Sequence, residues 1–159
     1  MRTLFIESRE EIDAVIRACK TCYVAMCDDG VPYVLPLNFG YNGECITLHS
    51  AQHGRMWETL KKKPNVCINF TLGEELAWQD VRVGCSYRVK SKSVIVEGTV
   101  EFIEDYEQKV KHLNDTMAQY SDGEFKFSKP AVINVGILKV HIDKITGKEF
   151  GAKVIVPGK

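Results

Sequence analysis

Residues 23–49 read YVAMCDDGVPYVLPLNFGYNGECITLH, and this stretch decides the fold class. It contains three apolar runs, at 23–26, 33–39 and 45–49. The first two runs are separated by Asp29-Gly30 and the last two by Asn42-Gly43. Because these dipeptides favour the tight turns of β-hairpins, the stretch predicts three antiparallel strands joined as a meander.

Pro36 lies inside the second of these runs. Proline has no amide proton to donate to a strand ladder, and in sheets it is therefore confined to edges and bulges. We expect this strand to be bulged, or to lie at an edge where another segment docks.

The same patterns extend along the rest of the chain. A capping box from Ser8 to Glu11 and apolar residues at helical spacing predict a helix over 9–20. Further helices are expected at 53–63 and 105–120, and further strands at 66–71, 83–88, 93–104 and 132–145. A polar turn is expected at 90–92 and a loop at 121–130. The pattern at 72–81 is mixed and predicts neither a helix nor a strand.

These elements predict a single domain over residues 1–159 of the α+β class, mainly β, with an antiparallel six- to seven-stranded barrel and flanking helices. Helices do not alternate with strands, and neither GxGxxG nor a P-loop occurs. Both observations argue against a Rossmann enzyme.

Composition narrows the classes of partner. Lys plus Arg and Asp plus Glu number 21 each, so no overall field attracts nucleic acid or an anionic membrane. No apolar run has the length of a membrane span. An export signal would continue apolar, whereas this sequence becomes acidic at Glu7, which argues against such a signal. We expect a cytoplasmic protein whose six cysteines are reduced. Cys19 and Cys22 form a lone CxxC, which leaves a zinc or redox site as a weaker alternative, and no metal is predicted.

The densest cluster of polar groups is HSAQHGR at 49–55, between a strand end and a helix start. A helix N-terminus offers free amides, Ser50 and His53 add donors, and Gly54 permits close backbone approach. Arg55 adds a planar fork that suits phosphate, and Lys61 and Lys62 follow along the helix. The cluster fits a phosphate-binding corner, and equally an ordinary helix start with solvated basic residues.

Five strings carry a family resemblance: PLNF at 36–39, LHSAQHGR at 48–55, the segment 60–66, CSYR at 85–88 and KSVIVEG at 92–98. Together they resemble the successive signatures of pyridoxamine 5'-phosphate oxidase-like FMN-binding split barrels. The pattern HSAxxG at 49–54 is similar to the nitroimidazole-resistance branch in particular. The resemblance extends from Tyr23 to 145–148.

This resemblance implies a split barrel, and a homodimer with two FMN sites at the subunit interface. It places the phosphate and ribityl end of FMN at 49–55 and the ring beside Asn38, with Tyr87, Arg88 and Ser93 approaching from neighbouring strands. The cofactor-binding residues expected on this basis are Pro36, Leu37, Asn38, His49, Ser50, Ala51, His53, Gly54, Arg55, Lys61, Lys62, Tyr87, Arg88 and Ser93.

His49 is the expected catalytic residue, because the matching histidine of the resembled branch lies beside the flavin, and imidazole titrates near neutral pH. Its alternative role is that of a satisfied, half-buried core histidine. The expected function is an FMN-dependent oxidoreductase that passes electrons from a nicotinamide donor to a small acceptor such as a nitro compound or quinone. A non-catalytic flavin- or haem-binding module is the alternative. Pyridoxamine phosphate oxidation ranks lower, since 151–159 contain no arginine.

Overall fold

The computed structural model describes residues 2–152. Its strands are β1 (Arg2–Ile6), β2 (Cys22–Asp28), β3 (Val31–Leu37), β4 (Phe39–Tyr41), β5 (Cys45–Ala51), β6 (Asn65–Ala77), β7 (Arg88–Ile103) and β8 (Val135–Ala152). Its helices are α1 (Arg9–Ala18), α2 (Arg55–Lys62), α3 (Tyr106–Ala118) and α4 (Lys129–Asn134), with a 3₁₀ turn, η1, at Gly84–Ser86.

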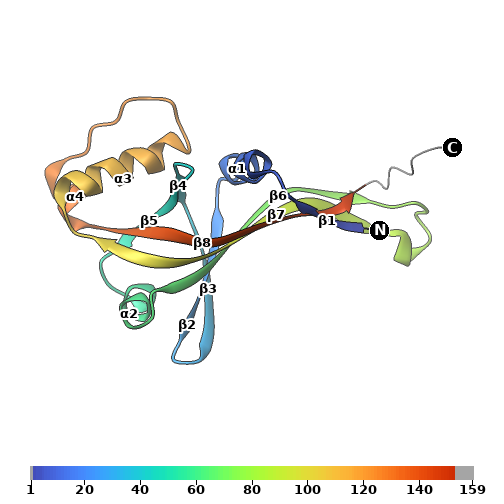
Figure 1. The fold of residues 1–159 in the computed structure, drawn as a ribbon, viewed down its shortest axis with the longest axis horizontal. Helices are drawn as coiled ribbons and strands as arrows, with labels where there is room; N and C mark the ends of the chain where they lie inside the picture. The colour runs from blue at the N-terminus through green and yellow to red at the C-terminus, as the bar shows by residue number, and fades with distance from the viewer. Residues whose placement is uncertain (1, 153–159) are drawn as a thin grey trace.

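All the described strands belong to one antiparallel sheet. Its order is β3-β2-β6-β7-β8-β5-β4, and β1 pairs with the end of β8. The expected α+β split barrel is confirmed, with eight strands among residues 2–152 rather than six or seven. In the body of the molecule, α3 and α4 lie on one side of the sheet and α2 on the other (Figure 1).

Asn38 explains why this sheet curls. The expected strand at 33–39 breaks here, because Asn38 is the only residue between β3 and β4, which stand at opposite ends of the strand order. The expected meander of three neighbouring strands is therefore wrong, since β3 pairs with β2 and β4 with β5. The two edges must therefore approach each other, although no ladder joins them within the described residues. Pro36 lies in an edge strand, as one of the two expectations had it, and the register of β3 with β2 runs without a shift.

The barrel interior is formed by alternate strand residues. Along β2, Cys22, Val24 and Met26 are buried while Tyr23 and Cys27 are exposed. Each fully buried large aliphatic or aromatic side chain contributes about 1.5–3 kcal/mol to folding. Strands β6 and β7 show the same alternation, whereas β4 and the first four residues of β5 are buried throughout, and together these strands surround one continuous core.

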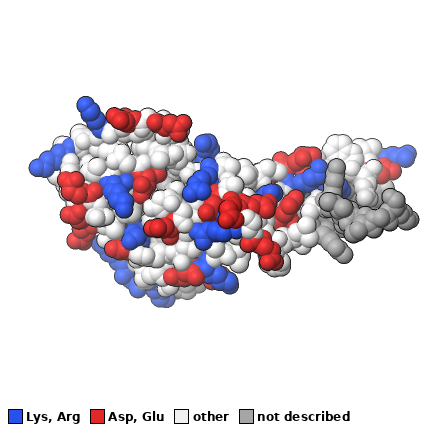
Figure 2. Space-filling view, turned by 45° about the horizontal axis from the view of Figure 1, so that its top comes forward, with Lys and Arg blue, Asp and Glu red and all other residues white. Residues whose placement is uncertain are grey.

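The sheet extends out of the body as an arm, formed by β1 together with residues 72–93 and 147–152. Figure 2 shows this arm as a narrow projection from the wider body, with charges of both signs interspersed. The arm carries exposed large apolar side chains, namely Leu4, Phe5, Leu76, Trp78, Val81, Val83, Tyr87 and Val89.

The arm is also where sequence-based boundaries were wrong. The expected turn at 90–92 lies inside the continuous strand β7, and the expected strand 83–88 holds η1. Lys90 and Lys92 look like turn residues, but their amines pair with Glu75 and Glu11 at 3.0 and 2.5 Å. Polar residues are therefore compatible with a strand here, because neighbouring carboxylates satisfy them.

Three further boundaries differ from expectation. β6 continues to Ala77 through residues that predicted nothing definite, and β8 continues past residue 145 to Ala152. Helix α4 replaces the end of the expected loop and the start of the expected strand at 132. Its N-cap is Ser128, whose hydroxyl accepts from the amide of Ala131 at 3.4 Å, and Pro130 stands in its first turn. Both features favour a helix start.

Candidate functional site

His49 lies near the end of β5 and is half-buried. Strands β4 and β5 are antiparallel, and Phe39 pairs with Leu48. If this register is extended by one residue, Asn38 lies opposite His49. The Nδ1 atom of His49 is buried and has no hydrogen-bond partner among residues 2–152. Burial lowers the pKa of His49 from its ordinary value of 6.5, so the ring is neutral at pH 7.

Helix α2 is seated beside this histidine by a close approach to β8. Ser50 pairs with Gly136, and His49 pairs with the next residue, Ile137. A Cβ atom on Gly136 would overlap the ring of Trp57, which belongs to α2. Because Gly136 has no side chain, the indole of Trp57 can lie directly on β8. This contact sets the position of the first turn of α2 against the sheet.

The N-terminus of α2 has no side-chain cap from the described residues. Its N-cap residue is Gly54, with φ of 101°, and the first helical bond runs from the Glu58 amide to the Gly54 carbonyl at 3.0 Å. Ser50 donates its hydroxyl to the carbonyl of Ala51 at 2.8 Å, and His53 is exposed. The first amides of the helix can therefore receive an anion.

The cations expected at this corner are engaged with carboxylates. Arg55 Nε lies 2.8 Å from Asp28 Oδ2, and its guanidinium stacks 4.2 Å above the centre of the Tyr33 ring. The hydrogen bond from Arg55 lowers the pKa of Asp28. A phosphate at the start of α2 would therefore share the Arg55 guanidinium with Asp28.

Lys61 and Lys62 occupy the last turn of α2. Lys62 Nζ lies 3.4 Å from Asp29 Oδ2, and Lys61 Nζ lies 3.5 Å from Glu58 Oε1. Residues in the last turn of this eight-residue helix stand about 10 Å along its axis from the first amides. The turn between β2 and β3 is thus linked to α2 at both of its aspartates.

Asn38 is held at the junction of the two sheet edges by the segment that follows α3. Its amide nitrogen donates to the hydroxyl of Tyr120 at 3.3 Å and to the carbonyl of Lys20 at 3.4 Å. The same hydroxyl accepts from the amide of Phe39 at 2.9 Å. Sequence reasoning missed Tyr120, because only the tertiary fold brings it beside residues about eighty positions away. Pro36 and Leu37 precede this junction at the end of β3.

The arm holds the other expected residues. Tyr87 stacks on Trp78, with ring centres 5.5 Å apart and planes 19° apart, and its hydroxyl donates to the carbonyl of Val81 at 3.0 Å. Arg88 opens β7, opposite Ala77. Ser93 pairs with Lys148, so it stands well out along the sheet.

The expected site is therefore divided within one chain. His49 pairs with Ile137 and Ser93 with Lys148, two positions on the same strand β8. At about 3.3 Å per residue, these positions lie about 35 Å apart along the strand. One copy of the chain brings together Asn38 and the segment 49–55 but leaves Tyr87, Arg88 and Ser93 at a distance.

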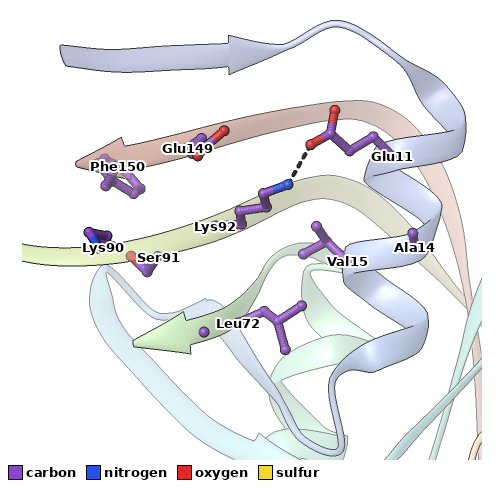
Figure 3. A pocket seen from close by; sticks show the side chains of 10 residues that line it. Glu11, Ala14, Val15, Leu72, Lys90, Ser91, Lys92, Glu149 and Phe150 are labelled. Atoms are coloured by element: carbon purple, nitrogen blue, oxygen red, sulfur yellow. Dashed lines mark hydrogen bonds and ion pairs between the residues drawn. The ribbon is translucent and has the colours of Figure 1, made fainter. Parts of the chain in front are cut away.

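A cavity of about 370 Å³ lies at the root of the arm, between α1 and the strands β6, β7 and β8 (Figure 3). The ion pair of Glu11 and Lys92 spans one side of it, and Val15 and Leu72 contribute apolar walls (Figure 3). None of the expected site residues in the described chain lines this cavity.

Residues 2–152 contain no cluster of three or more His, Cys, Asp or Glu side chains that could hold a metal ion. None of the helices in that range is long and apolar enough to cross a membrane.

The open, curled antiparallel sheet with its flanking helices defines a split-barrel protein. The family model of pyridoxamine 5'-phosphate oxidase matches residues 8–149, which is most of the chain. The chain belongs to the pyridoxamine 5'-phosphate oxidase-like family, and the resemblance seen in its sequence strings is confirmed. Among curated proteins, none matches the chain.

Solved structures agree with this assignment. A candidate 5-nitroimidazole antibiotic resistance protein from Bacteroides thetaiotaomicron is 42% identical, with a TM-score of 0.84 over 93% of this chain and 87% of that one. The flavocytochrome Anf3 from Azotobacter vinelandii is 20% identical, with a TM-score of 0.81 over 94% and 70%. A FAD- and haem-binding protein from Mycobacterium smegmatis is 19% identical, with a TM-score of 0.83 over 93% and 74%. The last two show the shared fold alone.

Proposed function

We propose that the protein is an FMN-dependent oxidoreductase that passes electrons from a nicotinamide donor to a small organic acceptor, such as a nitro compound or a quinone. The observation that carries the proposal is the corner at the end of β5, where the unpartnered imidazole of His49 adjoins the uncapped start of α2. The 42% identity to a candidate nitroimidazole resistance protein supports the choice of acceptor.

The residues of this corner divide the work between binding and proton handling. The first amides of α2 and the guanidinium of Arg55 would hold the phosphate of FMN, and Asn38 would flank the ring. Bound flavin supplies the redox chemistry, while the protein sets orientation and access. Because Nδ1 of His49 is buried, proton exchange with an acceptor molecule would run through Nε2 of the neutral ring.

We also propose that the active form is a homodimer in which the arm of one copy covers the corner of the other. Two observations support this arrangement. Tyr87, Arg88 and Ser93 cannot reach His49 within one chain, and the arm exposes large apolar side chains such as Trp78 and Val81. A two-fold axis would then produce two equal sites, each with residues from both subunits.

A non-catalytic flavin- or haem-binding module is the second candidate. It is supported by the fold shared with the flavocytochrome and with the FAD- and haem-binding protein. The engagement of Arg55 by Asp28 also favours it, since a competing carboxylate would weaken an FMN-phosphate contact.

The absorption spectrum of the purified protein, before and after incubation with FMN, distinguishes these candidates. Flavin bands that remain after desalting support the first, and a Soret band supports haem binding. A colourless protein after both treatments would remove both. Oxidation of NADH or NADPH in the presence of a nitro compound or a quinone then separates an enzyme from a carrier.

A further inference from the structure

A second cavity, of about 240 Å³, lies beside α2 and shares only Gln52 with the segment 49–55. It is lined by Gln52, Trp57, Phe102, Ile103, Glu104 and Lys109. These residues come from the loop before α2, from α2 itself, from the end of β7 and from α3. Gln52 and Glu104 are exposed, so the cavity is open to solvent on their side.

Lys109 brings a buried ammonium to this cavity. Its exposed fraction is only 7%. Nζ donates to the carbonyl of Val135 at 2.8 Å and to that of Ile133 at 3.3 Å. Gln52 Nε2 donates to the same two carbonyls, at 3.1 and 2.7 Å. The ammonium and the amide therefore lie side by side, and both are groups that donate hydrogen bonds.

The charge of Lys109 has no anionic partner in the described chain: among residues 2–152 no carboxylate lies within salt-bridge distance of its Nζ. Removing an ammonium from water is costly unless charges or hydrogen bonds compensate it. Two neutral carbonyls use two of its three N–H groups and leave one donor, together with the net charge.

Two aromatic side chains also line the cavity. Trp57 and Phe102 meet edge to face, with ring centres 4.8 Å apart and planes 82° apart. This edge-to-face packing holds the two rings together as an apolar part of the cavity lining. We propose that this cavity binds a small planar carboxylate, with an oxygen on the remaining N–H donor of Lys109 and its apolar part against Trp57 and Phe102. Glu104 at the rim repels such an anion and limits its affinity.

Calorimetric titration of the full-length protein with benzoate tests the proposal, with benzamide as the neutral isostere. Benzoate should bind at one site per chain, and benzamide should bind about tenfold more weakly or worse. Lys109→Met should lower benzoate affinity by about tenfold or more, since it removes a charge-assisted contact. Glu104→Gln, at an exposed position, should raise it severalfold. Equal affinity for benzoate and benzamide, or no binding of benzoate, overturns the proposal.

Two controls locate the ligand and check the fold. His49→Gln should leave benzoate affinity unchanged, and a loss in that variant would place benzoate at the His49 corner and overturn the proposal. Since Lys109→Met could fail to fold, its circular dichroism is compared with wild type. If the variant is unfolded, Glu104→Gln decides alone, and unchanged affinity there contradicts the assignment. The proposal is independent of flavin, so its failure would leave the proposed function unaffected.

Discussion

At the scale of single residues, His49 is the group with the most direct consequence for turnover. If it assists proton transfer, His49→Ala should slow electron transfer to a nitro compound or quinone by about a hundredfold. FMN affinity should change much less, because the imidazole adjoins the ring rather than the phosphate in the proposed site. Stopped-flow reoxidation of the reduced protein measures the first quantity and FMN titration the second. Reoxidation at the wild-type rate would make His49 structural.

Arg55 and Asp28 provide a matched pair for the phosphate end. Arg55→Ala should weaken FMN binding by about ten- to a hundredfold, as expected for the loss of a charge-assisted contact. Asp28→Asn removes the carboxylate that competes for the same guanidinium. It should therefore leave FMN affinity equal or tighter. Titration of the apo-protein with FMN gives both constants, and weaker binding in Asp28→Asn would show that the ion pair positions Arg55 instead of competing with phosphate.

His112 makes stability depend on pH. Its Nδ1 forms a buried hydrogen bond with Thr47 Oγ1 at 2.7 Å, and burial lowers its pKa from 6.5. A histidine whose folded pKa is depressed contributes stability that is present above its unfolded pKa and is lost as pH falls below about 6.5. Urea unfolding at pH 7.5 and 5.5 should therefore show a loss of stability at the lower pH.

The variant His112→Asn should reduce that loss, because it has no imidazole to protonate. Part of the loss should remain, since burial also lowers the pKa of His49. An identical loss in wild type and His112→Asn would show that His112 does not contribute to the pH dependence of folding.

At the scale of elements, the contact between α2 and β8 is the feature most sensitive to one added carbon. Gly136→Ala should destabilise the fold by about 1–3 kcal/mol, because its methyl group would overlap the Trp57 ring. Gly84→Ala is the matched control, since nothing lies within 4 Å of a Cβ at that position. Urea denaturation of both variants checks the prediction, and equal midpoints would show that α2 shifts without cost.

Local signals predicted the elements that are stabilised locally. The capping box at Ser8 gave α1 its start, and Ser8 Oγ accepts from the Glu11 amide at 3.2 Å. Strand β1 was not predicted, because what defines it is pairing with β8 at the far end of the chain. The arm was mispredicted for a related reason: its polar residues find cross-strand partners, such as Glu75 for Lys90, that short-range patterns do not reveal.

The residues of the candidate site also form two groups, those placed by local sequence and those placed by tertiary structure. The string at 49–55 is contiguous, so its position at the start of α2 could be predicted from the sequence. The position of Asn38 opposite His49 follows from register, and the support from Tyr120 follows from tertiary packing. The distance between the corner and Ser93 depends on the length of β8, which the sequence did not indicate beyond residue 145.

At the scale of the whole molecule, the divided site makes a prediction about assembly. Sedimentation over a dilution series should show a dimer, and FMN should shift the equilibrium towards it, because a ligand shared by two subunits stabilises their association by linkage. Val81→Asp, at an exposed apolar position of the arm, should weaken the dimer. A monomer at every concentration would reject the dimer. A dimer dissociation constant that is the same with and without FMN would reject a shared site.

Strand β8 has a further consequence, for the way the chain acquires its structure. It is the last described strand in sequence, yet it forms ladders with β1, β5 and β7, and Thr3 pairs with Phe150. During synthesis on the ribosome, β5 and β7 must therefore emerge with edges that have no partner until β8 follows. Such late, long-range pairing slows folding and leaves strand edges open to aggregation. We expect the nascent chain to depend on chaperones more than its modest length suggests.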